Sequence, residues 1–474
     1  MVARNRTSFQ SFSWPAAFVV AVAIFSAPAA AHADEKHPWQ VGLAKAVITP
    51  ADSMWMAGYA ARKSPSEGKL HDLYAKAAAF QDPQGRRLVV VTLDLVGIPR
   101  ELSLNVLKGV EHQHQLKPHE LLLNASHTHC GPELRTNKVY FYGIPEEQGQ
   151  KIAKYTTWLT EQLIELVGAA LADVQPARLA VSHDMATFAK NRRFPTPTGF
   201  ANREYLDGPV DHEVPVLQVW RRSGDGSEKL AGLLFGYACH NTTLSVMQFC
   251  GDYAGFAQIA LEKQLPGIQA MFVMGAGGDQ NPYPRREIPL AEQHGARLAT
   301  AVMRALKKPA TAVSPTLHTA RADATLQFQP LPPRKELEAD LESSNVYRVR
   351  KAKYLLDQLN AGQEIDLTYP CPVHVARFGD QIILVAIGGE LVVDYSHKLK
   401  SAINEGPLVW VAGYSNDVFG YLPSKRVLLE GGYEGGGAML YGALPGPFAE
   451  DVEDRVLATV DELLKRTQAQ KQQP

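Results

Sequence analysis

The segment His127-Thr128-His129 carries the side chains of this chain most able to do chemistry. It follows the apolar run Leu121-Leu122-Leu123, which has the composition of a buried strand. Side chains at i and i+2 of a strand point to the same face, so we expect the two imidazoles to converge. Imidazole is the commonest protein ligand of zinc, and the convergence point is therefore a candidate metal site.

A catalytic zinc ion usually has three or four protein ligands and keeps one position open for water. The further candidates are His240 and Glu390, because each follows an apolar run that is predicted to be a strand. A zinc-bound water can ionise near neutral pH, which would make it a nucleophile. The spacing along the chain does not by itself bring these residues together, so the strands must position them.

Apolar runs with the composition of strands recur along the chain, and polar residues follow most of them. The predicted strands are 87–93, 121–123, 231–239, 271–274, 382–387 and 408–412. Stretches with helical spacing of apolar residues lie between some of them, at 149–171, 253–265, 290–306 and 451–465, and residues 335–360 favour a charged helix or a helical hairpin.

Strands that alternate with helices indicate the α/β class. The expected architecture is a mixed β-sheet core with flanking helices. Continuous apolar strands are expected to be buried on both faces. Because ligand sites of such sheets lie at the C-terminal ends of the strands, we expect the active site there.

Composition restricts the partners. The chain has 474 residues, is 45% hydrophobic and 20% charged, and has a formal net charge of −1. These values are typical of a globular protein and give no electrostatic argument for a nucleic-acid or anionic-membrane partner. No apolar run after residue 33 reaches the roughly 18 to 20 residues of a transmembrane helix. The composition leaves the oligomeric state open.

The N-terminus has the layout of a secretory signal peptide. A basic start with Arg4 and Arg6 precedes the apolar run 16–31, and Ala31-His32-Ala33 is a small-x-small cleavage site. We predict a signal peptide over 1–33, a single domain over 34–467 and a polar tail over 468–474. The mature protein is then exported, to the periplasm or the medium; the alternative is a retained N-terminal anchor.

Other chemistries fit the sequence less well. A metallo-β-lactamase-like site needs His-x-His-x-Asp-His, but Cys130-Gly131-Pro132 follows the pair. An amidohydrolase barrel places His-x-His on its first strand, whereas earlier strands are predicted here. Neither a Gly-x-Ser-x-Gly elbow nor a phosphate-binding loop stands out. For Cys130 and Cys239, packing or a disulfide is favoured over a thiolate ligand.

Ordered motifs over most of the chain resemble the neutral ceramidases, which are zinc-dependent amidases that split ceramide into sphingosine and a fatty acid. The resemblance runs from about Val41 to about Arg466. The matching segments are Val41–Pro50, Met56–Tyr59, His71–Ala77, Ser126–Pro132, Asn191–Arg193, Ala238–Thr242, Gly251–Asp252, Gly278–Pro282, Tyr433–Gly435 and Leu440–Gly442.

The resemblance implies roles for particular residues. Zinc would be held by His127, His240, Glu390 and Tyr421. His129 and Tyr433 would contact the reacting amide, and Arg192 would orient it. His129 is the expected proton donor to the departing amine and Tyr433 the alternative, because the resemblance does not assign each step to one of the two. Asp279 and Asn281 would lie near the substrate head group.

The sequence differs from the neutral ceramidase pattern at three points, and these differences weaken the inference of ceramide as the substrate more than the inference of zinc-dependent hydrolysis. Asn281 stands where the family has serine, Cys130 replaces a serine beside the histidine pair, and we expect no C-terminal immunoglobulin-like domain because the chain ends soon after Leu440–Gly442. We therefore predict an exported zinc-dependent amidohydrolase that cleaves an N-acyl amide, with ceramide as the first candidate. The alternatives are a zinc hydrolase of another amide or ester, or a non-catalytic binding protein with the same fold.

Overall fold

The computed structural model describes residues 39–222, 227–403 and 406–472. The predicted signal peptide lies outside the described residues. Among the described residues, no helix is both long enough and apolar enough to cross a lipid bilayer.

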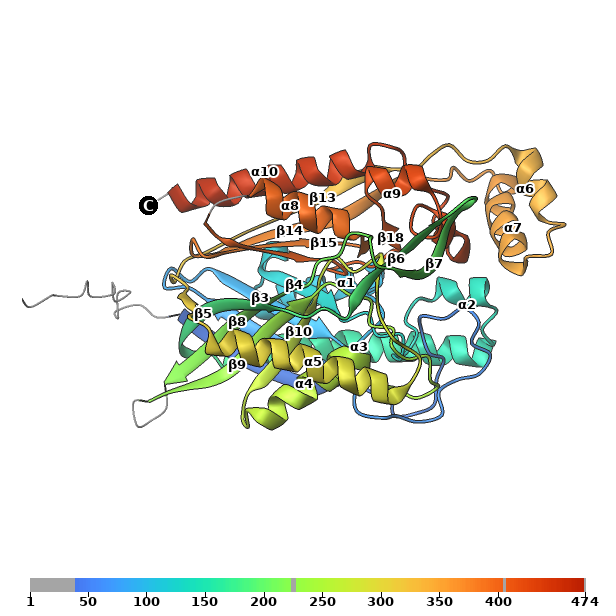
Figure 1. Cartoon of the computed structure of the whole chain (residues 1–474). Helices are drawn as coiled ribbons and strands as arrows, with labels where there is room; N and C mark the ends of the chain where they lie inside the picture. Colours follow the sequence, from blue (N-terminus) through green and yellow to red (C-terminus); the bar gives the residue numbers. More distant parts are fainter. Residues whose placement is uncertain (1–38, 223–226, 404–405, 473–474) are drawn as a thin grey trace, which may run out of the picture. The chain divides into compact units, whose positions relative to one another are not determined.

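Two β-sheets form the centre of the fold (Figure 1). The nine-stranded sheet has the order β10 (Gln269–Met274), β9 (Glu228–Tyr237), β8 (Glu213–Arg222), β5 (Gln175–Met185), β1 (Trp39–Val47), β2 (Tyr74–Gln81), β3 (Arg87–Leu93) and β4 (Leu121–Ala125), and β12 (Thr311–Ala312) pairs with β5. The four-stranded sheet has the order β13 (Leu317–Gln327), β14 (Thr368–Phe378), β15 (Ile382–Ile387) and β17 (Leu408–Ala412).

Both sheets are mixed. The pairs β3–β4, β9–β10 and β15–β17 are parallel, and the remaining pairs of the two sheets are antiparallel. All three parallel pairs join apolar strands that the sequence predicted, and β3, β15 and β17 begin and end at the predicted residues. The predicted class, an α/β fold with mixed sheets and flanking helices, is confirmed.

The two sheets pack face to face. Trp39, Phe80 and Leu122 of the large sheet share one buried apolar cluster with Phe378 and Trp410 of the small sheet. Phe378 packs against both aromatic residues, with its ring centroid 5.9 Å from that of Trp39 and 5.2 Å from that of Phe80. Burial of this apolar surface between the sheets is the main force that holds the layers together.

Helices cover the outer faces of both sheets (Figure 1). The large sheet is covered by α1 (Arg100–His114), α3 (Glu146–Ala172), α4 (Asp252–Gln264) and α5 (Ile288–Lys307), and the small sheet by α8 (Val393–Ala402) and α10 (Val452–Gln472). The C-terminal helix α10 is longer than expected, because it continues to Gln472 through most of the predicted polar tail.

Shorter elements surround the ends of the strands. They are η1 (Pro118–Glu120), α2 (Asn137–Tyr142), β6 (Ala189–Thr196), β7 (Gly199–Tyr205), β11 (Gln280–Pro282), α6 (Arg334–Asp340), α7 (Val346–Asn360), β16 (Glu390–Leu391), β18 (Tyr421–Leu422), α9 (Lys425–Glu430) and η2 (Gly437–Tyr441). Helices α6 and α7 form the helical hairpin that was predicted for residues 335–360.

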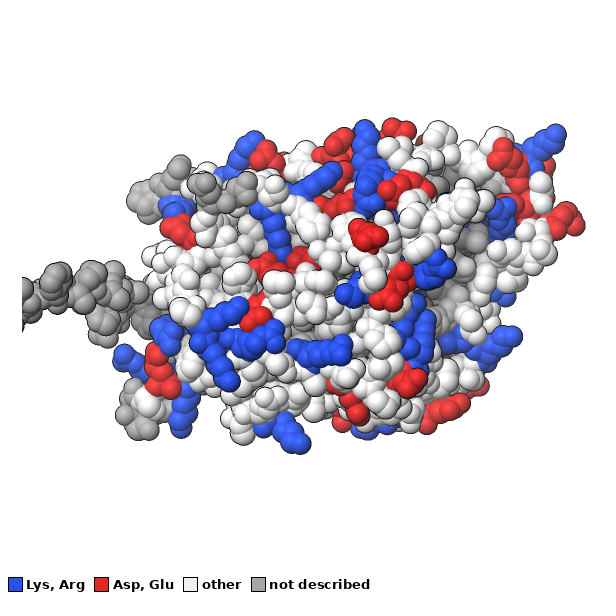
Figure 2. Space-filling view, in the orientation of Figure 1, with Lys and Arg blue, Asp and Glu red and all other residues white. Residues whose placement is uncertain are grey.

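The face shown in Figure 2 carries Lys and Arg side chains with Asp and Glu side chains among them.

The edge strands β4 and β10 of the large sheet meet through a buried side chain. Asn124 Oδ1 accepts the Met274 backbone N–H at 2.8 Å, and Asn124 Nδ2 donates to the Gly413 carbonyl at 2.8 Å. One asparagine at the end of β4 thus connects the ends of β10 and β17. This connection brings together the loops that follow three strands far apart in the sequence.

Candidate metal centre

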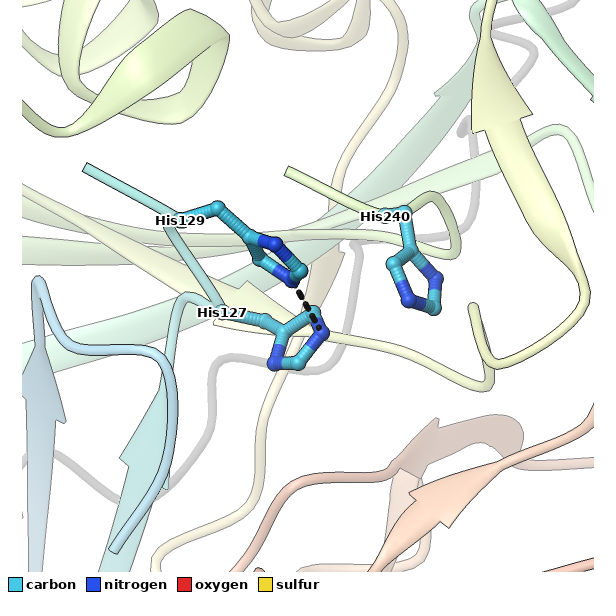
Figure 3. A group of neighbouring side chains, drawn as sticks. All are labelled: His127, His129 and His240. Atoms are coloured by element: carbon cyan, nitrogen blue, oxygen red, sulfur yellow. Dashed lines mark hydrogen bonds between the residues drawn. The ribbon is translucent and has the colours of Figure 1, made fainter. Parts of the chain in front are cut away.

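His127 and His129 lie in the loop after β4, and not on the strand itself. The backbone of His127 has φ = 61°, a left-handed conformation that is uncommon for a residue with a side chain. The predicted convergence is real, since the two Nε2 atoms lie 3.1 Å apart (Figure 3). Its cause is the turn at His127, so the expectation that strand alternation aligns the two rings is corrected.

His240 approaches the same point from the segment after β9. Its backbone N–H donates to the Gln280 carbonyl at 2.8 Å, and the side chain is buried. The rings of His127 and His240 are nearly perpendicular, with centroids 4.7 Å apart. One ring nitrogen from each of His127, His129 and His240 lies within 4.8 Å of the others, which defines a group that could hold a metal ion (Figure 3).

Glu390 and Tyr421 reach the same space from a short parallel ladder. They are direct partners in the register of β16 and β18. Gly389 adopts φ = 78°, a conformation that favours glycine, just before the ladder starts. Glu390 Oε2 lies 3.2 Å from His127 Nε2 and 3.3 Å from His240 Nε2, and the Tyr421 hydroxyl lies 3.2 Å from His240 Nε2.

The hydrogen bonds of His127 and His240 determine which ring nitrogens carry protons. His127 Nδ1 donates to the Val96 carbonyl at 2.5 Å, and His240 Nδ1 donates to the Gly277 carbonyl at 2.7 Å. The pKa of His240 is lowered to about 3, mainly by burial and in second place by the positive charge of Arg192, so this ring is neutral. With Nδ1 protonated, a neutral imidazole presents a lone pair at Nε2.

In these protonation states three hydrogen-bond acceptors face one another: His127 Nε2, His240 Nε2 and the Glu390 carboxylate. The buried Glu390 Oε2 makes no hydrogen bond, although two Nε2 atoms lie close to it. Such a group is unfavourable without a cation at its centre. Ligands about 2.0–2.1 Å from a tetrahedral zinc lie about 3.3 Å from one another, and this spacing fits the observed one. The outer carbonyls match the usual support of metal-bound histidine.

His129 has a different environment from the other two histidines. Its Nδ1 is buried without a hydrogen-bond partner, and its ring packs edge-on against Tyr59, with centroids 4.8 Å apart. The pKa of His129 lies well below its ordinary value, mainly because the ring is buried and in second place because His127 and His240 are close to it. No carbonyl orients this ring, and the lowered pKa keeps it neutral, so His129 can exchange a proton with a group at the centre.

Arg192 connects the centre to a buried ion pair. Its Nε donates to Glu434 Oε1 at 2.7 Å and its Nη2 donates to the Tyr421 hydroxyl at 2.9 Å. Arg193 Nη1 donates to the other oxygen of Glu434, also at 2.7 Å. Antiparallel pairing of β6 with β11 holds the backbone beside both arginines. The Tyr421 oxygen thus accepts a hydrogen bond from Arg192, while its hydroxyl lies beside the His240 Nε2 lone pair.

A cavity of about 740 Å³ opens beside the centre. His127, His129, Glu390, Tyr421 and Tyr433 line one part of its wall. The Tyr433 ring centroid lies 5.3 Å from that of Tyr421. The space is sufficient for part of an extended small-molecule substrate next to the histidines.

Asp279 and Asn281 do not line this cavity. Asp279 accepts hydrogen bonds from the Val393 backbone N–H at 2.9 Å and from Asn191 Nδ2 at 3.2 Å, and Asn281 Oδ1 accepts one from Arg192 Nη1 at 3.3 Å. Both side chains are buried. The contacts of Asp279 are those of a residue that supports the backbone, and those of Asn281 place it behind Arg192. Their predicted roles in substrate binding stay predictions.

The thiols do not take part in the centre. All four cysteines are free and buried, and Cys239 Sγ contacts the His240 carbonyl at 3.7 Å. Three residues of the site were missed by sequence reasoning: Gly58, Glu434 and Lys138. Gly58 and Glu434 lie within motifs quoted above, but no spacing rule assigns them a contact.

Gly58 is expected to tolerate no side chain. Its φ is 93°, and a Cβ atom there would lie 2.4 Å from His129 Cγ. Gly58→Ala should therefore displace the His129 ring and lower the free energy of unfolding by about 1–3 kcal/mol through backbone strain. Denaturant unfolding together with the measured kcat checks this, and Gly85→Ala, where a Cβ meets no atom at φ = 78°, isolates the strain from the clash. Equal activity loss in both variants would contradict the contact with His129.

The fold and the site together define an α/β protein with mixed sheets and a candidate metal centre of three histidines. The sequence profile described as "Neutral/alkaline non-lysosomal ceramidase, N-terminal" matches residues 39–282, and the chain belongs to this family.

Individual relatives agree with this assignment. The chain is 26% identical over 265 residues to neutral ceramidase A of Dictyostelium discoideum, and 24% identical over 248 residues to the neutral ceramidase of Mycobacterium tuberculosis. These matches cover 52% and 48% of this chain but only 36% and 37% of the relatives. The crystal structure of neutral ceramidase from Pseudomonas aeruginosa shares the fold, with a TM-score of 0.68, 20% identity, and coverage of 92% of this chain and 75% of that chain.

Proposed function

We propose that this protein is an exported, zinc-dependent amidohydrolase that cleaves an N-acyl amide, with ceramide as the first candidate substrate and sphingosine and a fatty acid as the products. The observation that carries the proposal is the convergence of the His127 and His240 Nε2 atoms on the unpartnered Glu390 Oε2. Membership of the neutral/alkaline ceramidase family supports the reaction class.

His127, His240, Glu390 and Tyr421 would hold the zinc ion. When bound there, zinc would supply a Lewis acid that polarises the amide carbonyl and ionises water near neutral pH. Arg192 keeps the Tyr421 hydroxyl in place by donating to it, and Glu434 fixes the guanidinium.

His129 would transfer the proton in the reaction. Its imidazole is neutral, because burial lowers its pKa, and Nε2 faces the centre. His129 can therefore accept the proton that the attacking water loses and then donate it to the departing amine nitrogen. Tyr433, which lines the same cavity, is the candidate donor to the developing oxyanion.

The purified protein is expected to contain about one zinc ion per chain and to hydrolyse N-acyl amides. Removal of the metal with a chelator should abolish hydrolysis, and added zinc should restore it, because the side chains alone cannot ionise water at neutral pH. Metal analysis and hydrolysis of short- and long-chain ceramides and of other N-acyl amines test both statements.

The outcomes separate the alternatives. Hydrolysis of esters or other amides without ceramide turnover would identify a zinc hydrolase of a different substrate, the reading that Asn281 motivates. Binding of ceramide without turnover by the zinc-loaded protein would favour the non-catalytic alternative. A protein that holds no zinc and stays inert after zinc addition would refute the proposal.

A further inference from the structure

Lys138 is a cation without a carboxylate partner in the wall of the cavity beside the metal centre. It lies in the first turn of α2 and lines the same cavity as Glu390 and Tyr433. Its Nζ donates to the Tyr441 carbonyl at 2.5 Å and lies 5.0 Å from the centroid of the Tyr142 ring. Among the described residues, no Asp or Glu lies within ion-pair distance of it.

The other cations of the wall are compensated. Arg135 forms a two-fold ion pair with Glu133, with Nε–Oε1 and Nη2–Oε2 distances of 2.7 Å each. Arg100 lies 3.3 Å from an oxygen of Asp323 and 3.6 Å from an oxygen of Asp417. The carboxylates of the wall that are not paired in this way or assigned to the centre are exposed to solvent: Glu101, Glu161 and Asp366. Among the described residues that line the cavity, Lys138 is therefore the Lys or Arg side chain that has no carboxylate partner.

The surroundings of Lys138 disfavour a bare charge. The pKa of Lys138 is lowered to about 7, mainly by burial and in second place by the positive charge of Arg135. The negative charges of Glu133 and Glu390 raise this pKa and so oppose the shift. A neutral chain that filled the cavity would remove water from Nζ and leave the ammonium with one carbonyl and one ring. An anion in the same position would replace that water with a charge-assisted hydrogen bond.

We infer that the cavity selects N-acyl amides that carry a carboxylate within reach of Lys138 over neutral amides of the same size. This inference rests on the proposed amide hydrolysis and narrows its substrate class: neutral ceramide would be hydrolysed less efficiently than an N-acyl amide that carries such a carboxylate. The carboxylate can belong to the amine part, as in an N-acyl amino acid, or to the far end of the acyl part, as in the monoamide of a dicarboxylic acid. Both place the same charge in the cavity.

The test compares substrates of equal size that differ only in charge. One pair is an N-acylglycine and its N-acylglycinamide, and the other is an ω-carboxyacyl amide and its ω-carboxamide. At pH 7 the zinc-loaded enzyme should favour the carboxylate member of at least one pair by about tenfold or more in kcat/KM, because a hydrogen bond to a charged group is worth that much. The pair that shows the preference identifies which part of the substrate carries the anion.

Variants decide whether Lys138 causes the preference. Lys138→Met should abolish it, and Lys138→Arg should restore most of it. Lys351→Met is the matched control, because Lys351 Nζ donates to the carbonyls of Gly442 and Leu444 next to the Tyr441 carbonyl and yet does not line the cavity. If Lys138 only anchored this loop, both methionine variants would lose the preference equally, and the inference would be overturned.

Binding separates this inference from the proposed function. Calorimetry with the N-acylglycine and the N-acylglycinamide reports affinity even if neither is hydrolysed. Tighter, Lys138-dependent binding of the anion by a protein that hydrolyses neither these substrates nor ceramides would support the anion preference and refute the proposed hydrolysis. Equal hydrolysis and equal binding of both members of each pair would keep the proposed function and refute the anion preference.

Discussion

His127→Ala is expected to lose both the zinc ion and the hydrolytic activity, whereas His129→Ala should keep most of the zinc and lose the activity. The reason lies in the outer contacts of the two rings. The Val96 carbonyl orients His127 Nδ1 and exposes Nε2 as a ligand atom, but His129 Nδ1 has no partner. Of these two rings, that of His127 has the support that a metal-bound histidine usually has, and that of His129 lacks it.

The two variants should lower the activity to different extents and for different reasons. Loss of the metal should lower kcat/KM by about a thousandfold or more, since a Lewis acid contributes several kcal/mol. Loss of proton transfer through His129 should lower kcat by about a hundred- to ten-thousandfold at unchanged zinc content. Zinc analysis by atomic absorption and steady-state kinetics on one N-acyl amide measure both effects.

The alternative assignment makes a different prediction. His127, His129 and His240 form a group compact enough to hold a metal by themselves. If all three were ligands, zinc loss would be equal in the His127 and His129 variants, and the proposed division of roles would be wrong. His114→Ala is a suitable control, because this histidine bonds the Ile164 carbonyl far from the centre and should affect neither measurement.

Arg192→Met is expected to lower the free energy of unfolding by about 3–5 kcal/mol, because it removes one cation from a buried ion pair. The Arg192 and Glu434 side chains are each 4% exposed, so water cannot replace the lost contact. Glu434 would keep only Arg193, and the Tyr421 hydroxyl would lose its donor. Activity should fall as well, since Tyr421 is a predicted zinc ligand.

A double-variant cycle tests this reading. Arg192→Met combined with Glu434→Met removes both charges of the pair and leaves Arg193 with Glu430 at 3.1 Å, so it should recover part of the stability without restoring activity. Arg334→Met is the matched control at an exposed ion pair with Glu338, where the two side chains are 54% and 52% exposed, and should cost at most about 1 kcal/mol. Urea unfolding of the metal-free proteins measures all four. Additive losses at Arg192 and Glu434 would contradict a coupled buried pair.

The secondary structure followed from local patterns. Runs such as 87–93, 382–387 and 408–412 are apolar without interruption, and a strand buried on both faces needs this composition. The helices α3 and α5 extend the predicted segments by only a few residues at their ends, and α4 begins and ends one residue before the predicted limits. Apolar periodicity within a short window is a property of the sequence itself, so these elements could be predicted.

The pairing of the strands was decided by tertiary structure. The residues predict neither that two sheets stack through Trp39, Phe378 and Trp410, nor that Asn124 joins the ends of β4, β10 and β17. The register that sets Glu390 beside Tyr421 is equally nonlocal. Such contacts depend on which apolar faces can be buried together across long stretches of chain, and no short window contains this information.

The site shows the same division between sequence and structure. The residue types and their order indicated the histidines, the carboxylate and the tyrosines. The left-handed turn at His127, the close approach of Gly58 to His129 and the uncompensated charge of Lys138 appear only in the folded chain. Sequence determines which groups are available for chemistry, whereas packing determines their distances, their protonation and their partners, because these depend on neighbours contributed by remote segments.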